Sequence, residues 1–415
     1  MKGFRLVLML AAFCLAGLAI VPAAGARGML DPGFGENGVV EVPLLSDRGA
    51  WVWPIANADG SVFIGEDRQV CPRPGCPYET YLRRYTAAGK PDRDFGDVFL
   101  GQAKYGVGPE FDRRGRMLVS QHRKGGGLVL RRLLPGGSLD RSFGDGGSLT
   151  VPCRCSAARV SLVAHGRLLV SGSRTLREGR RYRGTVWVFL RLRPDGRPDR
   201  SFGGDGEVRL RMPGYNAPLN VLPRGGGLLL AGETCCHGEM QKPFVMRMSP
   251  DGRLDRRFGA RARQALKGVS GTRPEDIGWE WFRLFQRRGG AVEIYGFPYE
   301  GHGVAVKLTR DGRRDRSFAG DGVRFFRMDL SDAAPDGAGG TFVVGYRRYE
   351  GAFRLLPNGE RDRSFGLVRL PGVGAEYGAS IQPQGRGAAL VFGDNSYLCR
   401  SDCSGVPAMA RVLWR

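Results

Sequence analysis

The chain has 415 residues and a formal charge of +22, because 63 Lys and Arg outnumber 41 Asp and Glu. Its 66 Gly and 25 Pro make up more than a fifth of the residues, which argues against a helical bundle or coiled coil because both residues are unfavourable inside helices. A hydrophobic content of 42% argues against disorder, and only four His leave little for zinc sites or acid–base chemistry.

The N-terminus has the pattern of a secretory signal peptide. Two basic residues precede an apolar run from Leu6 to Val21, and residues 24–26 form an A-x-A cleavage pattern. The alternative is a membrane anchor, but the run is short and small residues follow it directly. We therefore expect a signal peptide at 1–26 and a single domain at 27–415. This domain is expected to be exported, without a transmembrane anchor, to the extracellular space, the periplasm or the cell envelope.

A Phe-Gly motif recurs along the whole mature chain. Its phenylalanines are 47 to 61 residues apart, and they are Phe34, Phe95, Phe143, Phe202, Phe258, Phe318 and Phe365. Such a period indicates a repeat architecture of seven units. Two units depart from the pattern, because Ala319 replaces the motif Gly and Phe258 runs into ARARQAL without the usual Gly-rich turn.

Each unit shows the same order of short strands. An alternating stretch such as GEVRLRM at 206–212 follows the Phe-Gly turn. Two apolar runs then flank a tight Gly turn, as in NVLPRGGGLLLAG at 220–232, and a last strand follows, as in FVMRMSPDG at 244–252. Gly supplies the positive φ that these hairpin turns require. The fold class we predict is all-β, a seven-bladed β-propeller of four-stranded antiparallel blades.

The two ends of the chain distinguish a closed propeller from an open β-solenoid, whose end repeats need capping. The chain ends in AMARVLWR at 408–415, which aligns with the last strand of a unit. It begins, after the signal peptide, with GMLDPGFG at 28–35, the turn that is missing from that end. Placed end to start, the termini complete one repeat, as a closed ring requires.

These units resemble the Delta-60 repeat family of exported bacterial proteins, whose mark is a Leu-Asp-x-x-Phe-Gly turn after a strand and an Asp-Gly turn. LDPGFG at 30–35 and SLDRSFGDGG at 138–147 match this mark best, and the resemblance covers residues 30–415. The resemblance implies a propeller-like fold and no common enzymatic activity.

The motif residues have a structural role that suffices to explain them. A motif aspartate such as Asp199 can accept turn N–H groups, as in Asx turns, and the motif glycines can take positive φ. The phenylalanines can fill the space between neighbouring sheets. A calcium loop at Asp199, Ser201 and Asp205 is the alternative, but Phe202 lies inside it and no acidic residue stands at the closing position. We therefore predict no metal and no cofactor.

A meander of strands sorts the loops onto two faces. The Asp-Gly and Phe-Gly turns lie on one, the constant-turn face, and the longer loops lie on the other, the variable-loop face. The eight Cys of the mature chain fall in the variable loops, and an even number in an exported chain favours disulfides over free thiols or a metal site. Cys71 with Cys76 and Cys399 with Cys403 are candidate local disulfides. The remaining four could bridge to each other or form a vicinal bond, and they are Cys153, Cys155, Cys235 and Cys236.

Two tryptophan pairs lie where variable loops enter the following strand, Trp51 with Trp53 and Trp279 with Trp281. Alternate residues on a strand point to one side, so each pair is a candidate for stacking on a flat ligand such as a sugar. Packing around the central axis is the alternative, and it is the one we favour.

The basic residues are 56 Arg and 7 Lys, a bias that we attribute to a GC-rich genome. Six arginines share one motif position and should form a basic ring on the constant-turn face. They are Arg93, Arg141, Arg200, Arg256, Arg316 and Arg363. This ring could pair with the motif carboxylates or attract an anionic polymer. Nucleic acid fits poorly because the chain is expected to be exported and no recognition motif occurs.

Catalytic signatures are missing from the sequence, which has no G-x-S-x-G elbow, H-E-x-x-H helix or P-loop. We assign no catalytic residue and predict a monomeric, non-catalytic binding or scaffold protein. It would engage an anionic envelope polymer, a glycan or a protein through the variable-loop face. The alternative is a propeller-type enzyme, a lyase, hydrolase or quinone-dependent dehydrogenase, with its site in the central funnel.

Overall fold

A computed structural model gives the structure of the protein. It describes residues 27–45, 50–71, 76–103, 106–123, 127–151, 153, 155–179, 181–212, 220–234, 242–269, 279–298, 303–346, 351–373, 379–385, 387–393 and 407–414. The signal peptide predicted at 1–26 lies outside these residues. Among the described residues, no helix is both long enough and apolar enough to cross a membrane.

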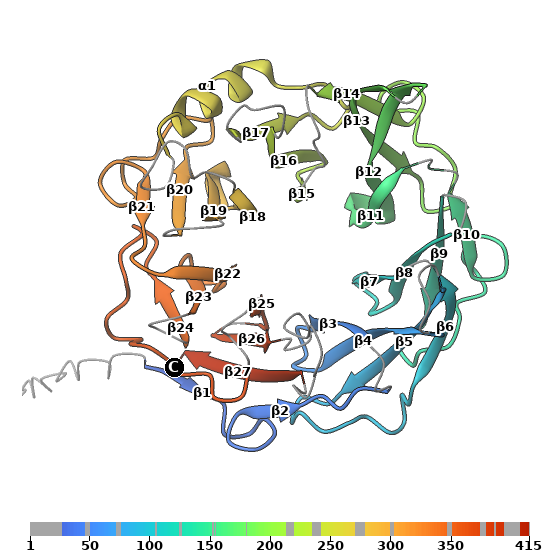
Figure 1. The fold of residues 1–415 in the computed structure, drawn as a ribbon, viewed down its shortest axis with the longest axis horizontal. Helices are drawn as coiled ribbons and strands as arrows, with labels where there is room; N and C mark the ends of the chain where they lie inside the picture. Colours follow the sequence, from blue (N-terminus) through green and yellow to red (C-terminus); the bar gives the residue numbers. More distant parts are fainter. Residues whose placement is uncertain are drawn as a thin grey trace, which may run out of the picture.

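The chain forms a ring of seven antiparallel sheets, the blades, around a central axis (Figure 1). The first strand of each blade in the sequence lies nearest the axis (Figure 1), and it contacts the first strands of both neighbouring blades. The predicted propeller of four-stranded antiparallel blades is therefore confirmed.

The blades are numbered here in chain order, and their elements follow. Blade 1 holds β3 (Ala50–Ala56), β4 (Val62–Gln69), β5 (Tyr78–Tyr85) and β6 (Val98–Ala103); blade 2 holds β7 (Gly106–Phe111), β8 (Met117–His122), β9 (Leu128–Leu133) and β10 (Ser148–Val151). Blade 3 holds β11 (Ser156–Val163), β12 (Arg167–Glu178), β13 (Arg181–Leu192) and β14 (Glu207–Met212); blade 4 holds β15 (Asn220–Arg224), β16 (Gly227–Thr234), β17 (Lys242–Met248) and helix α1 (Arg256–Leu266). Blade 5 holds β18 (Trp279–Gln286), β19 (Val292–Pro298), β20 (Val304–Leu308) and β21 (Val323–Phe325); blade 6 holds β22 (Asp329–Pro335), β23 (Thr341–Tyr346) and β24 (Gly351–Leu355). Blade 7 holds β25 (Ser380–Pro383), β26 (Ala388–Gly393), β27 (Ala408–Trp414), β1 (Gly28–Leu30) and β2 (Val39–Glu41).

Blade 7 closes the ring by joining the two ends of the chain. Its strand β27 pairs with β26 on one side and with β1 and β2 on the other, so that Gly28 faces Trp414 and Val39 faces Ala410. The N–H of Gly28 also donates to the carbonyl of Phe365 in blade 6 at 2.9 Å. The closure expected from the termini is confirmed.

The hydrophobic core is divided into seven clusters, each between two neighbouring blades. Every cluster contains one motif phenylalanine, and none of these seven side chains is more than 8% exposed. Burying one phenylalanine stabilises a fold by about 1.5 to 3 kcal/mol. The motif phenylalanine is thus the wedge that joins each blade to the next, as the sequence predicts.

Blades 4 and 6 differ from the other blades at their outer edge. Residues 256–266, which include ARARQAL, form α1 because Ala, Arg, Gln and Leu favour helix and no Gly-rich turn starts a strand there. Asp255 caps this helix by accepting from the N–H of Phe258 at 2.9 Å. In blade 6 a single bridge between Ala352 and Val368 stands where the outermost strand would run.

The boundary of a blade differs from the boundary of a sequence unit. Outside blades 4 and 6, the alternating stretch after a Phe-Gly turn, such as 206–212, forms the outermost strand of the preceding blade. The meander still places the Asp-Gly and Phe-Gly turns on one side of the ring and the remaining loops on the other.

Candidate functional site

Every motif aspartate is paired with a basic residue near the end of the third strand of its blade. In six blades this basic residue precedes the aspartate by eight positions, and in blade 7 the pair joins the two ends of the chain. The pairs and their N···O distances are Arg84–Asp92 3.6 Å, Arg132–Asp140 2.8 Å, Arg191–Asp199 2.8 Å, Arg247–Asp255 2.5 Å, Lys307–Asp315 4.0 Å, Arg354–Asp362 2.6 Å and Arg411–Asp31 3.4 Å. We call these seven basic side chains the staple residues.

A staple residue also joins its blade to the next one. The Nε of Arg191 donates to Asp199, its Nη2 donates to the Ser201 hydroxyl at 2.8 Å, and its Nη1 donates to the carbonyl of Pro250 in blade 4 at 2.6 Å. Its guanidinium lies 4.6 Å from the centre of the Phe202 ring, within range of a cation–π interaction. Equivalent bonds to the next blade come from Arg247, Lys307 and Arg411.

The turns lower the pKa of four motif aspartates, Asp140, Asp199, Asp255 and Asp362. The hydroxyl of Ser142 and the guanidinium of Arg132 lower the pKa of Asp140 to about 2. Burial pushes the pKa of Asp199 upward, but hydrogen bonds from Ser201 and the charge of Arg191 outweigh it and hold that pKa below its usual value. In the turn that was considered as a calcium loop, the carboxylate of Asp199 therefore accepts the N–H of Ser201, as in an Asx turn, and forms an ion pair with Arg191.

The six arginines of the predicted basic ring are exposed and stand apart from the staple pairs. Within the described part of the chain, no ion pair involves any of them. The seventh blade carries Pro32 at this position. The motif carboxylates pair with the staple residues instead, so the predicted pairing between the basic ring and these carboxylates is wrong. Attraction of an anionic polymer by the ring stays a prediction.

Of the four candidate tryptophans, only Trp53 has its side chain among the described residues. It is half-buried, and its ring covers Gly65, its partner on β4, where an added Cβ would lie 2.2 Å from the ring. On β18 a bulge shifts the register between Trp279 and Trp281, so a regular alternation does not apply there. Packing accounts for Trp53, and stacking on a ligand stays a prediction.

Two of the disulfide predictions fall on described cysteines. Cys71 is bonded to Cys76, as expected for a local disulfide, and Cys153 is bonded to Cys155. The second bond decides between the pairings that the sequence left open for these two residues. The other four candidates, Cys235, Cys236, Cys399 and Cys403, lie outside the described residues.

The variable loop of blade 3 is a continuation of its strands. β12 and β13 each have 12 residues and pair from Leu168–Leu192 out to Glu178–Arg181. Residues 173–184 belong to one of the predicted variable loops, and the ladder continues into them, with Thr175 and Tyr182 among the residues that favour strands. We call residues 173–184 the basic hairpin, since they include five Arg and one Glu.

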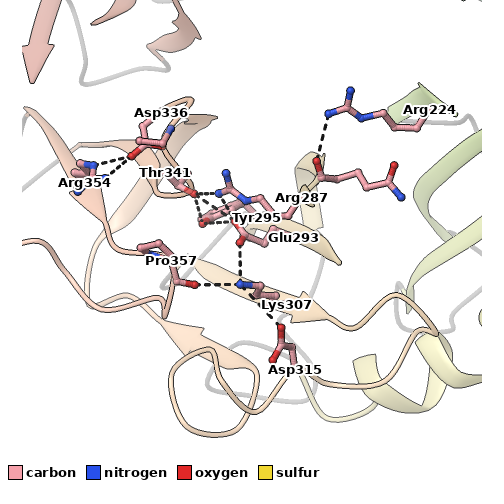
Figure 2. Close-up of polar contacts among 12 residues, drawn as sticks. Arg224, Arg287, Glu293, Tyr295, Lys307, Asp315, Asp336, Thr341, Arg354 and Pro357 are labelled. Atoms are coloured by element: carbon pink, nitrogen blue, oxygen red, sulfur yellow. Dashed lines mark hydrogen bonds and ion pairs between the residues drawn. The ribbon is translucent and has the colours of Figure 1, made fainter. Parts of the chain in front are cut away.

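A buried polar network lies between blades 5 and 6 (Figure 2). The carboxylate of Glu293 accepts from Arg287 at 2.6 Å and from the hydroxyls of Thr341 and Tyr295 at 3.3 and 3.4 Å, and it lies 3.7 Å from the ammonium of Lys307. Burial and the charge of Glu293 raise the pKa of Tyr295. The positions of Glu293 in other blades hold apolar residues such as Leu229, so this network replaces part of the usual core between blades.

Ionisable side chains of the innermost strands interact with residues of other blades. Asp332 on β22 accepts from both Nε and Nη2 of Arg283 on β18, at 2.5 and 2.8 Å, and from the N–H of Ile381 on β25 at 2.9 Å. Burial and the charge of Arg283 lower the pKa of Arg159 on β11, and burial raises the pKa of Glu110 on β7. Sequence reasoning did not identify these side chains, because they come from strands of different blades.

Comparison with known proteins shows no family for this chain. No protein-family model matches the sequence, and no curated protein matches it. Among solved structures, the β-propeller domain of the Trilobed protease from Pyrococcus furiosus matches with a TM-score of 0.46 and 9% identity, over 83% of this chain and 89% of that one. The PQQ-bound aldose sugar dehydrogenase from Streptomyces coelicolor matches with a TM-score of 0.35 and 12% identity, over 88% of this chain and 98% of that one.

Proposed function

We propose that the protein is an exported, non-catalytic binding scaffold of the Delta-60 repeat family that engages an anionic cell-envelope polymer through its variable-loop face. The observation that carries this proposal is the basic hairpin, which extends the second and third strands of blade 3 on that face. Export is supported by the N-terminal signal pattern and by the two disulfides, since disulfides persist in oxidising compartments.

Three arginines of the basic hairpin present positive charge to solvent. Arg177, Arg181 and Arg183 are exposed, and among the described residues of the hairpin Arg183 is the one whose ion pair with the carboxylate of Glu178 is seen. The charged surface continues onto the neighbouring strand β14, where Arg211 is exposed and donates to the carbonyl of Arg183 at 3.4 Å. Charges of one sign on an exposed surface attract a polyanion and bind it in a salt-dependent manner.

Retention on immobilised polymers tests this proposal. The double variant Arg177→Ser/Arg181→Ser removes two exposed charges from the hairpin, and Arg141→Ser/Arg200→Ser removes two from the constant-turn face as a matched control. The resins are a polyuronate, a polyphosphate and neutral dextran. We expect the unmodified protein to bind both anionic resins at about 0.15 M salt, where unpaired surface charges still act over about 8 Å, and to pass through dextran.

The hairpin variant should elute at clearly lower salt, whereas the control should elute near the unmodified protein. Equal retention on dextran, or an absence of retention on both anionic resins, would overturn the proposal. A loss confined to the control would place the polymer on the constant-turn face and overturn the assignment of the variable-loop face.

A further inference from the structure

A cavity of about 340 Å³ opens on the constant-turn face between blades 4 and 5. Blade 4 lines it with the first hairpin at 224–227, with Leu228 and Leu229, and with the turn at 248–250. Blade 5 lines it with Gln286 and Arg310. Its volume lies within the range of about 300 to 1,000 Å³ that is typical of small-ligand pockets.

The first hairpin of blade 4 has Arg224 at the position that Asp336 and Gln384 occupy in blades 6 and 7. Residues 225–227 are all Gly. At the corresponding tips of blades 6 and 7, a polar side chain covers the staple arginine: Asp336 accepts from Nε of Arg354 at 2.7 Å, and Gln384 accepts from Nε of Arg411 at 2.7 Å. Arg224 cannot accept such a bond and donates to the carbonyl of Gln286 instead, and residues 225–227 add no side chain, so the space above the staple pair of blade 4 stays open.

The staple pair of blade 4 is consequently exposed to this cavity. The side chains of Arg247 and Asp255 are each 32% exposed, compared with 8% and 7% for Arg191 and Asp199 in blade 3. Because Arg247 already neutralises Asp255, this pair contributes hydrogen-bonding groups to the cavity without adding net charge.

Two further arginines give the cavity its positive charge. Arg224, at the end of strand β15, donates through Nη2 to the carbonyl of Gln286 at 3.4 Å (Figure 2). Arg310 stands at a turn position that Pro194 and Pro250 occupy in blades 3 and 4. Among the described residues, neither Arg224 nor Arg310 has a carboxylate partner, so two guanidinium groups remain available to a ligand.

We propose that this cavity, the blade 4–5 pocket, binds a compact organic anion: one carboxylate or phosphate group on a body about the size of a single sugar ring. Guanidinium groups bind both kinds of anion through paired N–H bonds. The apolar side chains of Leu228, Met248 and Pro250 would contact the carbon skeleton, and Gln286 would contact its hydroxyl groups. The pocket lies on the face opposite the basic hairpin and does not depend on the proposed polymer binding.

Titration calorimetry on the full mature chain tests the blade 4–5 pocket, with glucuronate, glucose 6-phosphate, inorganic phosphate and neutral glucose as probes. We expect at least one of the two sugar anions to bind and glucose to give no heat. Arg224→Ser and Arg310→Ser should each weaken binding by about tenfold or more, the usual effect of losing a charge-assisted hydrogen bond. Arg288→Ser is the matched control, because Arg288 is exposed on the neighbouring turn of blade 5 and does not line the pocket.

A second pair of variants changes charge at constant size. Gly225 has a φ of +55°, which Asp and Asn tolerate better than other side chains, and an added Cβ would meet no atom within 4 Å. Gly225→Asp should abolish binding by placing a carboxylate at the pocket, whereas Gly225→Asn should retain it. Equal binding of glucose and the anions, equal loss in Arg310→Ser and Arg288→Ser, or no heat with any probe would overturn the inference. The pocket variants should be retained on the anionic resins as strongly as the unmodified protein. A failure of the pocket proposal can therefore be distinguished from a failure of the polymer proposal.

Discussion

Replacing Arg191 by Ala tests whether the staple residues hold the ring together. This side chain is 8% exposed, and it contacts the carboxylate of Asp199, the hydroxyl of Ser201, the carbonyl of Pro250 and the ring of Phe202. The substitution removes all four contacts at one junction between blades. It also leaves the buried carboxylate of Asp199 with a single guanidinium, that of Arg167 at 3.0 Å.

The expected loss follows from these contacts. Removing one partner of a buried ion pair costs about 3 to 5 kcal/mol, because the remaining charge stays desolvated. Arg167 still compensates part of the charge, so we place the loss of unfolding free energy near the lower limit, about 3 kcal/mol. Arg191→Lys should lose less, since Lys307 performs the same role in blade 5 with N···O distances of 4.0 Å to Asp315 and 3.1 Å to Pro357.

Urea unfolding followed by circular dichroism measures this loss. Arg200→Ala is the matched control, because Arg200 is a motif arginine of the same blade, exposed and without an ion pair to any described residue. The control should change the unfolding free energy by less than about 0.5 kcal/mol, as is usual for exposed side chains. The reasoning is refuted if Arg191→Ala is as stable as the control, or if Arg200→Ala is equally destabilising.

Two further predictions concern the same turns. The folded-state pKa values of Asp140, Asp199, Asp255 and Asp362 lie below the usual value. Their contribution to stability is therefore complete above the unfolded pKa of about 4 and is lost as the pH falls toward the folded pKa values. In thermal unfolding, the melting temperature should decline from about pH 4 to pH 2, and the decline should be weaker in Arg191→Ala. A melting temperature that does not change over this range would contradict the prediction. Ala319 has a φ of +51° at a position where other units have Gly. Ala319→Gly should raise the unfolding free energy by about 0.5 to 1 kcal/mol, because the relief of left-handed strain exceeds the added entropy of the unfolded chain. Ala338→Gly is the control. An equal effect of the two substitutions on the unfolding free energy would argue against strain at Ala319.

The repeated motif was enough to predict the number of blades and the burial of the phenylalanines, and the sequences at the two ends of the chain predicted the closure of the ring. Each of these properties follows from local patterns: alternation for strands, Gly for turns and one large apolar residue per unit. The Cys71–Cys76 disulfide was predictable for the same reason, because its two cysteines are only five positions apart.

The charged partners could not be predicted in this way. Sequence reasoning selected Arg200 and its counterparts because they lie inside the motif, whereas the structure pairs Asp199 with Arg191 on the preceding strand. The eight-residue spacing between the two was visible as a signal, but a β-turn reverses the chain between them, so only the folded hairpin shows that they meet. The contact of Arg283 with Asp332 and the blade 4–5 pocket were even less predictable, because their residues come from different blades. The sequence by itself determined the repeating unit and the number of its copies, whereas the contacts between copies were decided by the ring, which brings together residues that no local pattern relates.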